Sequence, residues 1–147
     1  MATLSRRDAL RIAAGSAALA VAGAPPASAS AVETIKAFTG NSAPETGRVV
    51  LDLASSVDDG NIVPLGVVVD SPMRPDDYVS EVLVVAEANP WPRVASFQFS
   101  PIAGKAAFAT RIRLTEAQHV TVLAKMNDGR VFMARQHVEV TIGACSS

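Results

Sequence analysis

The sequence of 147 residues contains a single cysteine, Cys145, and few aromatic side chains. One cysteine excludes an intramolecular disulfide and any metal site built from several thiolates. Aromatic residues make up only 5% of the chain, so a core must be built mainly from aliphatic side chains. Basic and acidic residues number 13 and 14, and neither kind is concentrated in a run. The chain therefore lacks the basic surface that nucleic-acid-binding proteins use.

Long hydrophobic runs are also lacking. The apolar stretch 12–24 has about 13 residues, fewer than the roughly 20 that span a bilayer. It follows Arg6-Arg7 and precedes Ala27-Ser28-Ala29, which has the A-x-A form of a cleavage site, as does Ala29-Ser30-Ala31. We expect residues 1–31 to be a cleaved twin-arginine signal peptide, which leaves a periplasmic protein with no membrane segment.

Removal of that segment leaves 116 residues, enough for one domain with a hydrophobic core. It takes three arginines and one aspartate from the totals, which leaves ten basic and thirteen acidic residues. We expect a sandwich domain over residues 32–142 and a flexible C-terminal arm over residues 143–147.

Residues 30–39 are the one stretch with helical spacing of apolar residues, and Gly40-Asn41 follows as a stop signal. The rest of the chain has short apolar runs separated by turn residues, and Asn127-Asp128-Gly129 is the strongest hairpin signal. The seven expected strands are Arg48–Leu53, Ile62–Asp70, Val79–Ala88, Val94–Ser100, Ala106–Leu114, His119–Met126 and Arg130–Ile142.

Several of these runs alternate apolar and polar residues, as half-buried antiparallel strands do. Val120, Val122 and Ala124, for example, alternate with His119 and Thr121. Seven short strands within about 100 residues predict an all-β, immunoglobulin-like sandwich with a short N-terminal helix.

Two runs are apolar on both faces, residues 66–69 and 82–86. The outer face of a small sandwich normally carries more charge, so something is expected to cover these strands. A partner subunit and the N-terminal helix are equally good candidates from the pattern alone.

Cys145 follows the last expected strand on a tail of small residues, Gly143, Ala144, Ser146 and Ser147. A thiol three residues beyond Ile142 reaches roughly 10 Å from the domain when the chain is extended. The residues leave three interpretations open: a thiol that is presented to other proteins, a disulfide to another chain, and an inert terminus.

Other candidate sites are weak. His119 and His137 have no thiol beside them for a metal site, and both are expected on solvated or interface surface. The Asp58-Asp59-Gly60-Asn61 segment is interpreted as a turn rather than a calcium loop. Arg111 and Arg113 are expected at a solvated or interface edge. Trp91, between two prolines, is expected to be a packed loop anchor or a partner contact.

From Arg48 to its end the chain resembles the SoxY family, the sulfur-carrier subunits of the bacterial thiosulfate-oxidising Sox system. The resemblance covers about 100 residues in order and includes a cysteine three residues from the C-terminus. The shared segments include Asp59-Gly60-Asn61, Ala88-Asn89-Pro90, Thr110-Arg111-Ile112-Arg113-Leu114, Gln118, Ala124-Lys125-Met126, Asp128-Gly129 and Val140-Thr141-Ile142-Gly143.

The resemblance implies a covalent sulfur carrier without enzymatic activity or cofactor, which holds sulfur intermediates on Cys145. It also implies a heterodimer with a SoxZ-like subunit and visits by Sox enzymes that load, oxidise and hydrolyse the bound sulfur. The family's tail is Gly-Gly-Cys-Gly-Gly, and Ala144, Ser146 and Ser147 depart from it, so this arm has less backbone freedom. The second class of function is a periplasmic binding or scaffolding module, whose terminal cysteine is incidental or links it to a partner.

Overall fold

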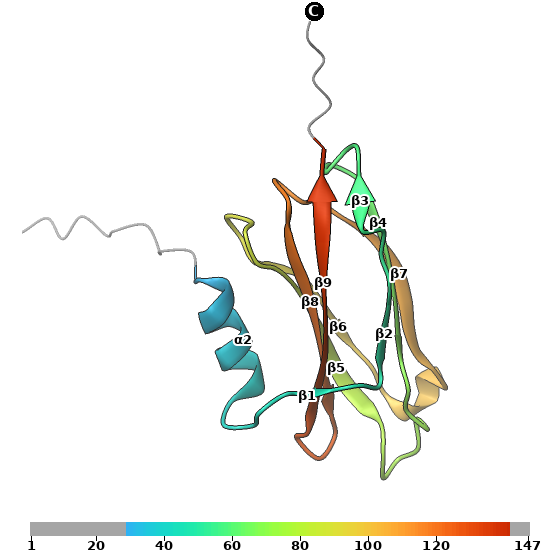
Figure 1. Cartoon of the computed structure of the whole chain (residues 1–147). Helices are drawn as coiled ribbons and strands as arrows, with labels where there is room; N and C mark the ends of the chain where they lie inside the picture. The colour runs from blue at the N-terminus through green and yellow to red at the C-terminus, as the bar shows by residue number, and fades with distance from the viewer. Residues whose placement is uncertain (1–28, 142–147) are drawn as a thin grey trace, which may run out of the picture.

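The computed structural model describes residues 29–141, which form two facing β-sheets and one helix (Figure 1). No helix in this range is long and apolar enough to cross a membrane. In chain order the elements are α2 (Ala31–Thr39), β1 (Glu45–Thr46), β2 (Val49–Asp52), β3 (Ser56–Val57), β4 (Val63–Val69), β5 (Val79–Ala86), β6 (Arg93–Gln98), the 3₁₀ turn η1 (Pro101–Ala103), β7 (Ala106–Ile112), β8 (Gln118–Met126) and β9 (Val131–Val140).

The larger sheet has the strand order β1-β9-β8-β5-β6, and β3 also pairs with β9. The smaller sheet has the order β2-β4-β7. The pairs among the seven longer strands are antiparallel, whereas β1 and β3 run parallel to β9. The two sheets pack face to face, which confirms the predicted immunoglobulin-like sandwich.

The core between the sheets follows the alternation in the sequence. On β4 the residues at positions 63, 65, 67 and 69 are buried, and on β8 those at 120, 122, 124 and 126 are buried. Phe97 of β6 stacks on Phe108 of β7 with 3.9 Å between ring centroids, which joins the two sheets at one edge. Dispersion and apolar burial therefore connect the layers in a sandwich that has no intersheet disulfide.

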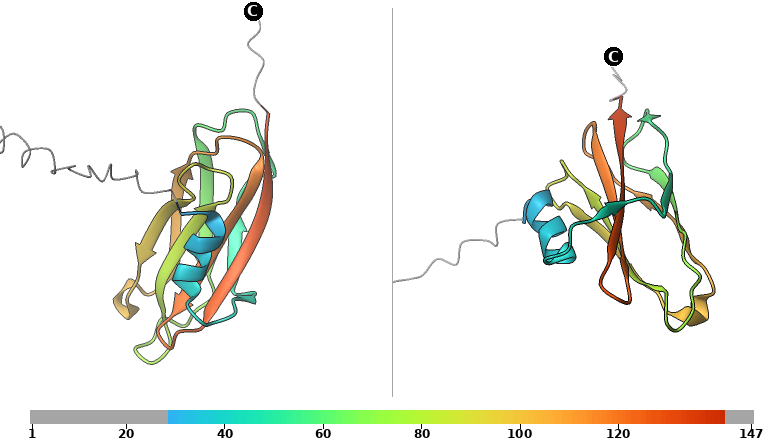
Figure 2. Two further views of the ribbon diagram at one scale, coloured as in Figure 1. Left: turned by 90° about the vertical axis from the view of Figure 1, so that its left-hand side faces the viewer. Right: turned by 60° about the horizontal axis from the view of Figure 1, so that its bottom comes forward.

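Helix α2 lies on the outer face of the larger sheet, as the left view of Figure 2 shows. Phe38 packs there on Leu83 and Val85 of β5, on Leu123 of β8 and on Val131 of β9. Helix α2 therefore covers β5. The sequence pattern had left the N-terminal helix and a partner subunit as equal candidates for this cover. The expectation that residues 82–86 lie against a partner subunit is wrong, because all five are fully buried within the chain.

The run 66–69 has a different environment. Val67 and Val69 face the core, but Val68 points away from it and is 39% exposed. Val50 on the neighbouring strand is 63% exposed. The outer face of the smaller sheet is therefore apolar, and none of the described elements covers it.

Local signals fix the ends of the helix. The Ser30 side chain accepts a hydrogen bond from the Glu33 backbone, and the Glu33 carboxylate accepts one from the Ser30 backbone. This capping box satisfies two N–H groups that have no partner within the helix. At the other end Gly40 adopts a φ of 61°, which glycine reaches without strain. These signals place the N-cap of α2 at Ser30 and its C-cap at Gly40.

All seven predicted strands are present with small shifts at their ends, and the predicted helix is confirmed. The two-residue strands β1 and β3 were not predicted. Each is held by backbone pairing to β9, with Glu45 opposite Phe132 and Ser56 opposite Glu139. Backbone pairing of two residues leaves no periodic pattern in the side chains, so the sequence contains no signal for them.

Candidate functional site at the end of β9

The five residues of the predicted carrier arm, Gly143 to Ser147, lie outside the described residues, and Cys145 is one of them. The structure describes the strand that leads to them. β9 ends at Val140, at the end of the sandwich where β3 lies (Figure 1). Cys145 follows Thr141 by four residues, so its distance from Thr141 is at most about 14 Å.

The base of the arm is firmly held. Val138 is fully buried, and β8 pairs with β9 from Val131 up to Val138. Beyond that point, backbone hydrogen bonds continue on the other side of the strand. The Glu139 N–H donates to the Ser55 carbonyl at 2.8 Å, and the Thr141 N–H donates to the Val57 carbonyl at 2.9 Å. The chain is thus fixed as far as the last described residue.

Gly60 packs beneath the end of β9. The Leu114 N–H donates to the Gly60 carbonyl at 2.7 Å. A Cβ on Gly60 would collide with the Leu114 carbonyl oxygen and would come within 3.0 Å of the Val140 Cγ1 atom. The sequence predicted a turn here, which is confirmed, since Asp59 Oδ1 accepts hydrogen bonds from the backbone and the side chain of Asn61. The role of Gly60 in close packing was not predicted.

A polar network connects two loops at the same end. Asn89 Oδ1 accepts hydrogen bonds from the Thr115 N–H, from the Thr115 hydroxyl and from Gln118 Nε2. Its Nδ2 donates to the Arg113 carbonyl at 2.7 Å, and the buried Gln118 accepts from the Ala88 N–H at 2.8 Å. Asn89 and Gln118, both within the resemblance segments, therefore hold the β5–β6 loop against the β7–β8 loop.

The histidines are neighbours on the outer face of the larger sheet. His119 and His137 face each other across β8 and β9, with ring centroids 4.8 Å apart. His137 Nδ1 lies 3.4 Å from a carboxylate oxygen of Glu139. His137 lies on β9, the strand that leads to the arm, and His119 lies beside it on β8. The sequence predicted surface positions for both. Within residues 29–141, no three His, Cys, Asp or Glu side chains converge as a metal site would require.

An ion pair lies beside the histidines. Arg135 donates two hydrogen bonds to Glu87, at 2.8 and 2.7 Å, and the buried Thr121 hydroxyl donates a third at 2.7 Å. The Arg135 hydrogen bonds hold the pKa of Glu87 below its ordinary value of 4.5, and Thr121 lowers it further, against the opposing effect of burial. The same contact raises the pKa of Arg135. This pair ties the end of β5 to β9 across β8.

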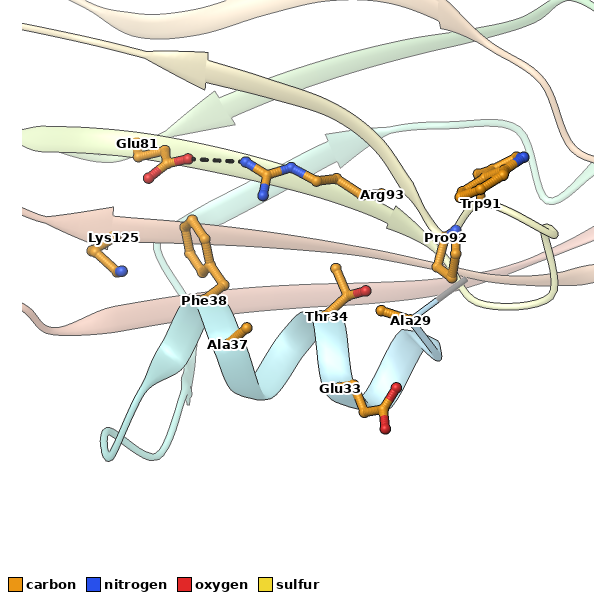
Figure 3. Close-up of a pocket in the computed structure, with 10 residues that line it drawn as sticks. All are labelled: Ala29, Glu33, Thr34, Ala37, Phe38, Glu81, Trp91, Pro92, Arg93 and Lys125. Atoms are coloured by element: carbon orange, nitrogen blue, oxygen red, sulfur yellow. Dashed lines mark ion pairs between the residues drawn. The ribbon is translucent and has the colours of Figure 1, made fainter. Parts of the chain in front are cut away.

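A groove of about 520 Å³ runs between α2 and the β5–β6 connection (Figure 3). Phe38 and Pro92 supply apolar surface, and Arg93 pairs with Glu81 at 3.6 Å. Trp91 lies at the rim and is 69% exposed. The prediction of a packed tryptophan anchor is wrong, because Pro92 is the residue of this loop that is buried.

The family model of the sulfur oxidation protein SoxY matches residues 35–145, which include both the sandwich and Cys145. The sulfur carrier protein SoxY from Chlorobium limicola f. thiosulfatophilum is similar in structure, with a TM-score of 0.64 and 23% identity over 76% of this chain and 96% of that chain. A superoxide reductase (neelaredoxin) from Ignicoccus hospitalis has a TM-score of 0.56 and 13% identity over 64% of this chain and 80% of that one. These two likenesses show a shared fold. No curated protein matches the chain.

Proposed function

Because the chain belongs to the SoxY family of sulfur oxidation proteins, we propose that it holds sulfur intermediates covalently on Cys145 and presents them to the enzymes of thiosulfate oxidation. The observation that carries this proposal is the extent of the family match, which runs through the sandwich and ends at Cys145 itself.

The end of β9 supports this role. Backbone hydrogen bonds hold the chain as far as Thr141, and only four residues separate that point from Cys145. A short segment on a fixed base lets the thiol enter a narrow active site while the sandwich stays outside. A free thiol with a pKa near 8.5 is only roughly 3% thiolate at pH 7, so the partner enzyme supplies the activation.

We also propose a cellular location and a partner subunit for the protein. A twin-arginine leader at the N-terminus sends the protein to the periplasm. There it forms a heterodimer with a SoxZ-like subunit, and Sox enzymes load, oxidise and hydrolyse the sulfur that Cys145 carries. The carrier itself catalyses none of these steps and needs no cofactor.

Intact-mass spectrometry of the protein isolated from cells grown on thiosulfate tests the proposal. We expect adducts of sulfur, sulfite or thiosulfate mass on the C-terminal peptide, and their loss in a Cys145→Ser variant. The melting temperature of the variant should stay nearly constant, because a residue beyond the last strand contributes little to packing. Adducts that persist in the variant would exclude Cys145 as the attachment site.

A further inference from the structure

The two histidines of the chain lie side by side on the outer face of the larger sheet. His119 of β8 is directly opposite His137 of β9, and their ring centroids are 4.8 Å apart. Two imidazoles that share one tetrahedral Zn²⁺ have centroids about 5 Å apart, because each Zn–N bond is about 2.0 Å long. The two rings meet edge to face, and rotation of one ring about χ2, a soft torsion, is enough to direct a nitrogen of each to a common point. The pair is therefore spaced as two ligands of one metal ion.

A carboxylate beside the pair favours one tautomer of His137. Glu139 lies two residues further along the same face of β9, and its carboxylate oxygen is 3.4 Å from His137 Nδ1. This neighbour favours the proton on Nδ1, which leaves the lone pair of Nε2 for a metal ion. Histidines that bind metals usually have such a carboxylate behind them. Arg135, next on this face, is paired with Glu87 through two hydrogen bonds, so its positive charge is compensated.

The pair lacks a third ligand among the described residues. Zinc in an open site usually has three protein ligands, and within residues 29–141 no third His, Cys, Asp or Glu side chain converges on the pair. The single cysteine lies within reach of it. His137 precedes Thr141 by four residues, about 13 Å along the strand direction. Cys145 follows Thr141 by four residues and reaches at most about 14 Å from it. The thiol can therefore return to the pair without any change in the sandwich.

We propose that His119 and His137 bind Zn²⁺ together with the thiolate of Cys145 of the same chain, and that water takes the fourth position. Histidine nitrogen and cysteine sulfur are the ligands that zinc prefers in proteins. Binding removes the thiol proton, because the thiolate is the form that binds a metal. A sulfur–zinc bond replaces the S–H bond, and the proton and the displaced waters pass to the solvent. Zn²⁺ has no redox chemistry, so no electron is transferred.

Zinc at this site holds the arm against the sandwich and changes the reactivity of its thiol. The electron pair with which the Cys145 sulfur attacks an electrophile is then shared with the metal ion. Zinc should therefore slow the alkylation and the oxidation of an unloaded Cys145, and removal of zinc should restore both. The site requires only a free thiol, so the inference does not depend on what Cys145 carries.

Replacement of zinc by cobalt tests the site, because a thiolate ligand gives Co²⁺ a charge-transfer band in the near ultraviolet that imidazole and water do not. The chain contains two histidines and one cysteine, so a single substitution removes each ligand. The full chain, reduced and without a histidine tag, should bind one Co²⁺ with this band, and added Zn²⁺ should displace it. His119→Asn and His137→Asn should each lose the band although Cys145 is intact. Cys145→Ser should also lose it and should bind Zn²⁺ more weakly.

Two carboxylate variants form a matched pair. Glu139→Gln should keep the cobalt band and weaken zinc binding about tenfold, as loss of a carboxylate behind a metal-binding histidine does. Glu45→Gln makes the same change at an exposed position of β1, which pairs with the other end of β9, and should leave zinc binding unchanged. Zinc should slow iodoacetamide alkylation of Cys145 in the parent and not in His137→Asn. Equal melting temperatures of the metal-free proteins would show that the variants are folded.

Four results would overturn the inference. They are a parent without the band, a band that persists in both histidine variants, a zinc affinity that Cys145→Ser leaves unchanged, and a band that returns when Cys145→Ser and His137→Asn chains are mixed. The last would place the ligands on different chains. Sulfur adducts are measured in parallel on protein from cells. Absence of adducts with zinc binding intact would count against the proposed function alone, and absence of zinc binding with adducts intact against this inference alone.

Discussion

Gly60 lies against Val140, the last residue of β9, so closely that a Cβ at position 60 would come within 3.0 Å of the Val140 Cγ1 atom. The carbonyl oxygen of Leu114 is closer still. The β3–β4 turn and the β7–β8 connection thus meet beneath the residue from which the cysteine-bearing segment departs.

This contact predicts the effect of one added methyl group. Gly60→Ala should destabilise the protein by about 2 kcal/mol, because the backbone of Leu114 cannot move aside as a flexible side chain could. Urea denaturation measures the loss. Asp58→Ala, an exposed change in the same turn, is the control and should cost less than about 0.5 kcal/mol. Equal losses in the two variants would mean that the turn, and not the contact with β9, sets the cost.

The cover of β5 gives a second prediction. Phe38→Ala removes the largest side chain that α2 buries on Leu83 and Val85, so it should cost about 3 kcal/mol. Val32→Ala is the matched control on the same helix, because Val32 is 60% exposed and should cost little. The stability of both proteins is also measured with a partner subunit present. Equal stability of the Phe38→Ala protein and its parent under that condition would mean that the partner, and not α2, covers β5.

The ion pair beside the histidines predicts a dependence of stability on pH. The folded-state pKa of Glu87 is lowered, chiefly by Arg135. The pair therefore contributes its full stability above the ordinary pKa of 4.5, and the contribution is lost as the pH falls through the lowered value. Arg135→Gln should reduce stability by about 1 kcal/mol at pH 7 and should have a much smaller effect near pH 3.

The measurement is the difference in unfolding free energy between the two proteins over this range of pH. Arg93→Gln removes a longer, more exposed contact to Glu81, at 3.6 Å, and serves as the comparison. A difference between Arg135→Gln and its parent that stays constant from pH 7 to pH 3 would show that the pair does not titrate as described.

The capping box predicts where a leader would be removed. Cleavage after Ala29 leaves Ser30 as the first residue, with its new amino group beside the Glu33 carboxylate that already accepts a bond from the Ser30 nitrogen at 2.9 Å. Cleavage after Ala31 removes the cap, which is worth about 1 kcal/mol. We therefore expect Ser30 at the N-terminus of the exported protein, and intact-mass measurement decides between the two sites. A start at Val32 would contradict the prediction.

The sequence determined the strands and the type of sandwich. Alternation such as that of Val120, Val122 and Ala124 identifies a buried face, since the two faces of a strand meet different surroundings. The order of the shared segments and the position of Cys145 also came from the sequence, because a resemblance to a family needs no coordinates. The helix was visible too, through Ser30, the apolar spacing that follows it, and Gly40.

Only the tertiary structure decided what lies on each face. The runs 66–69 and 82–86 look alike in the sequence, yet α2 covers one and no described element covers the other. Trp91 and Pro92 are neighbours, and the proline rather than the tryptophan is buried. Gly60 resembles any turn glycine until Leu114 and Val140 are placed against it. A local pattern in the sequence shows whether a side chain prefers burial. The residues that bury it lie in a distant part of the chain, and only the tertiary structure brings them together.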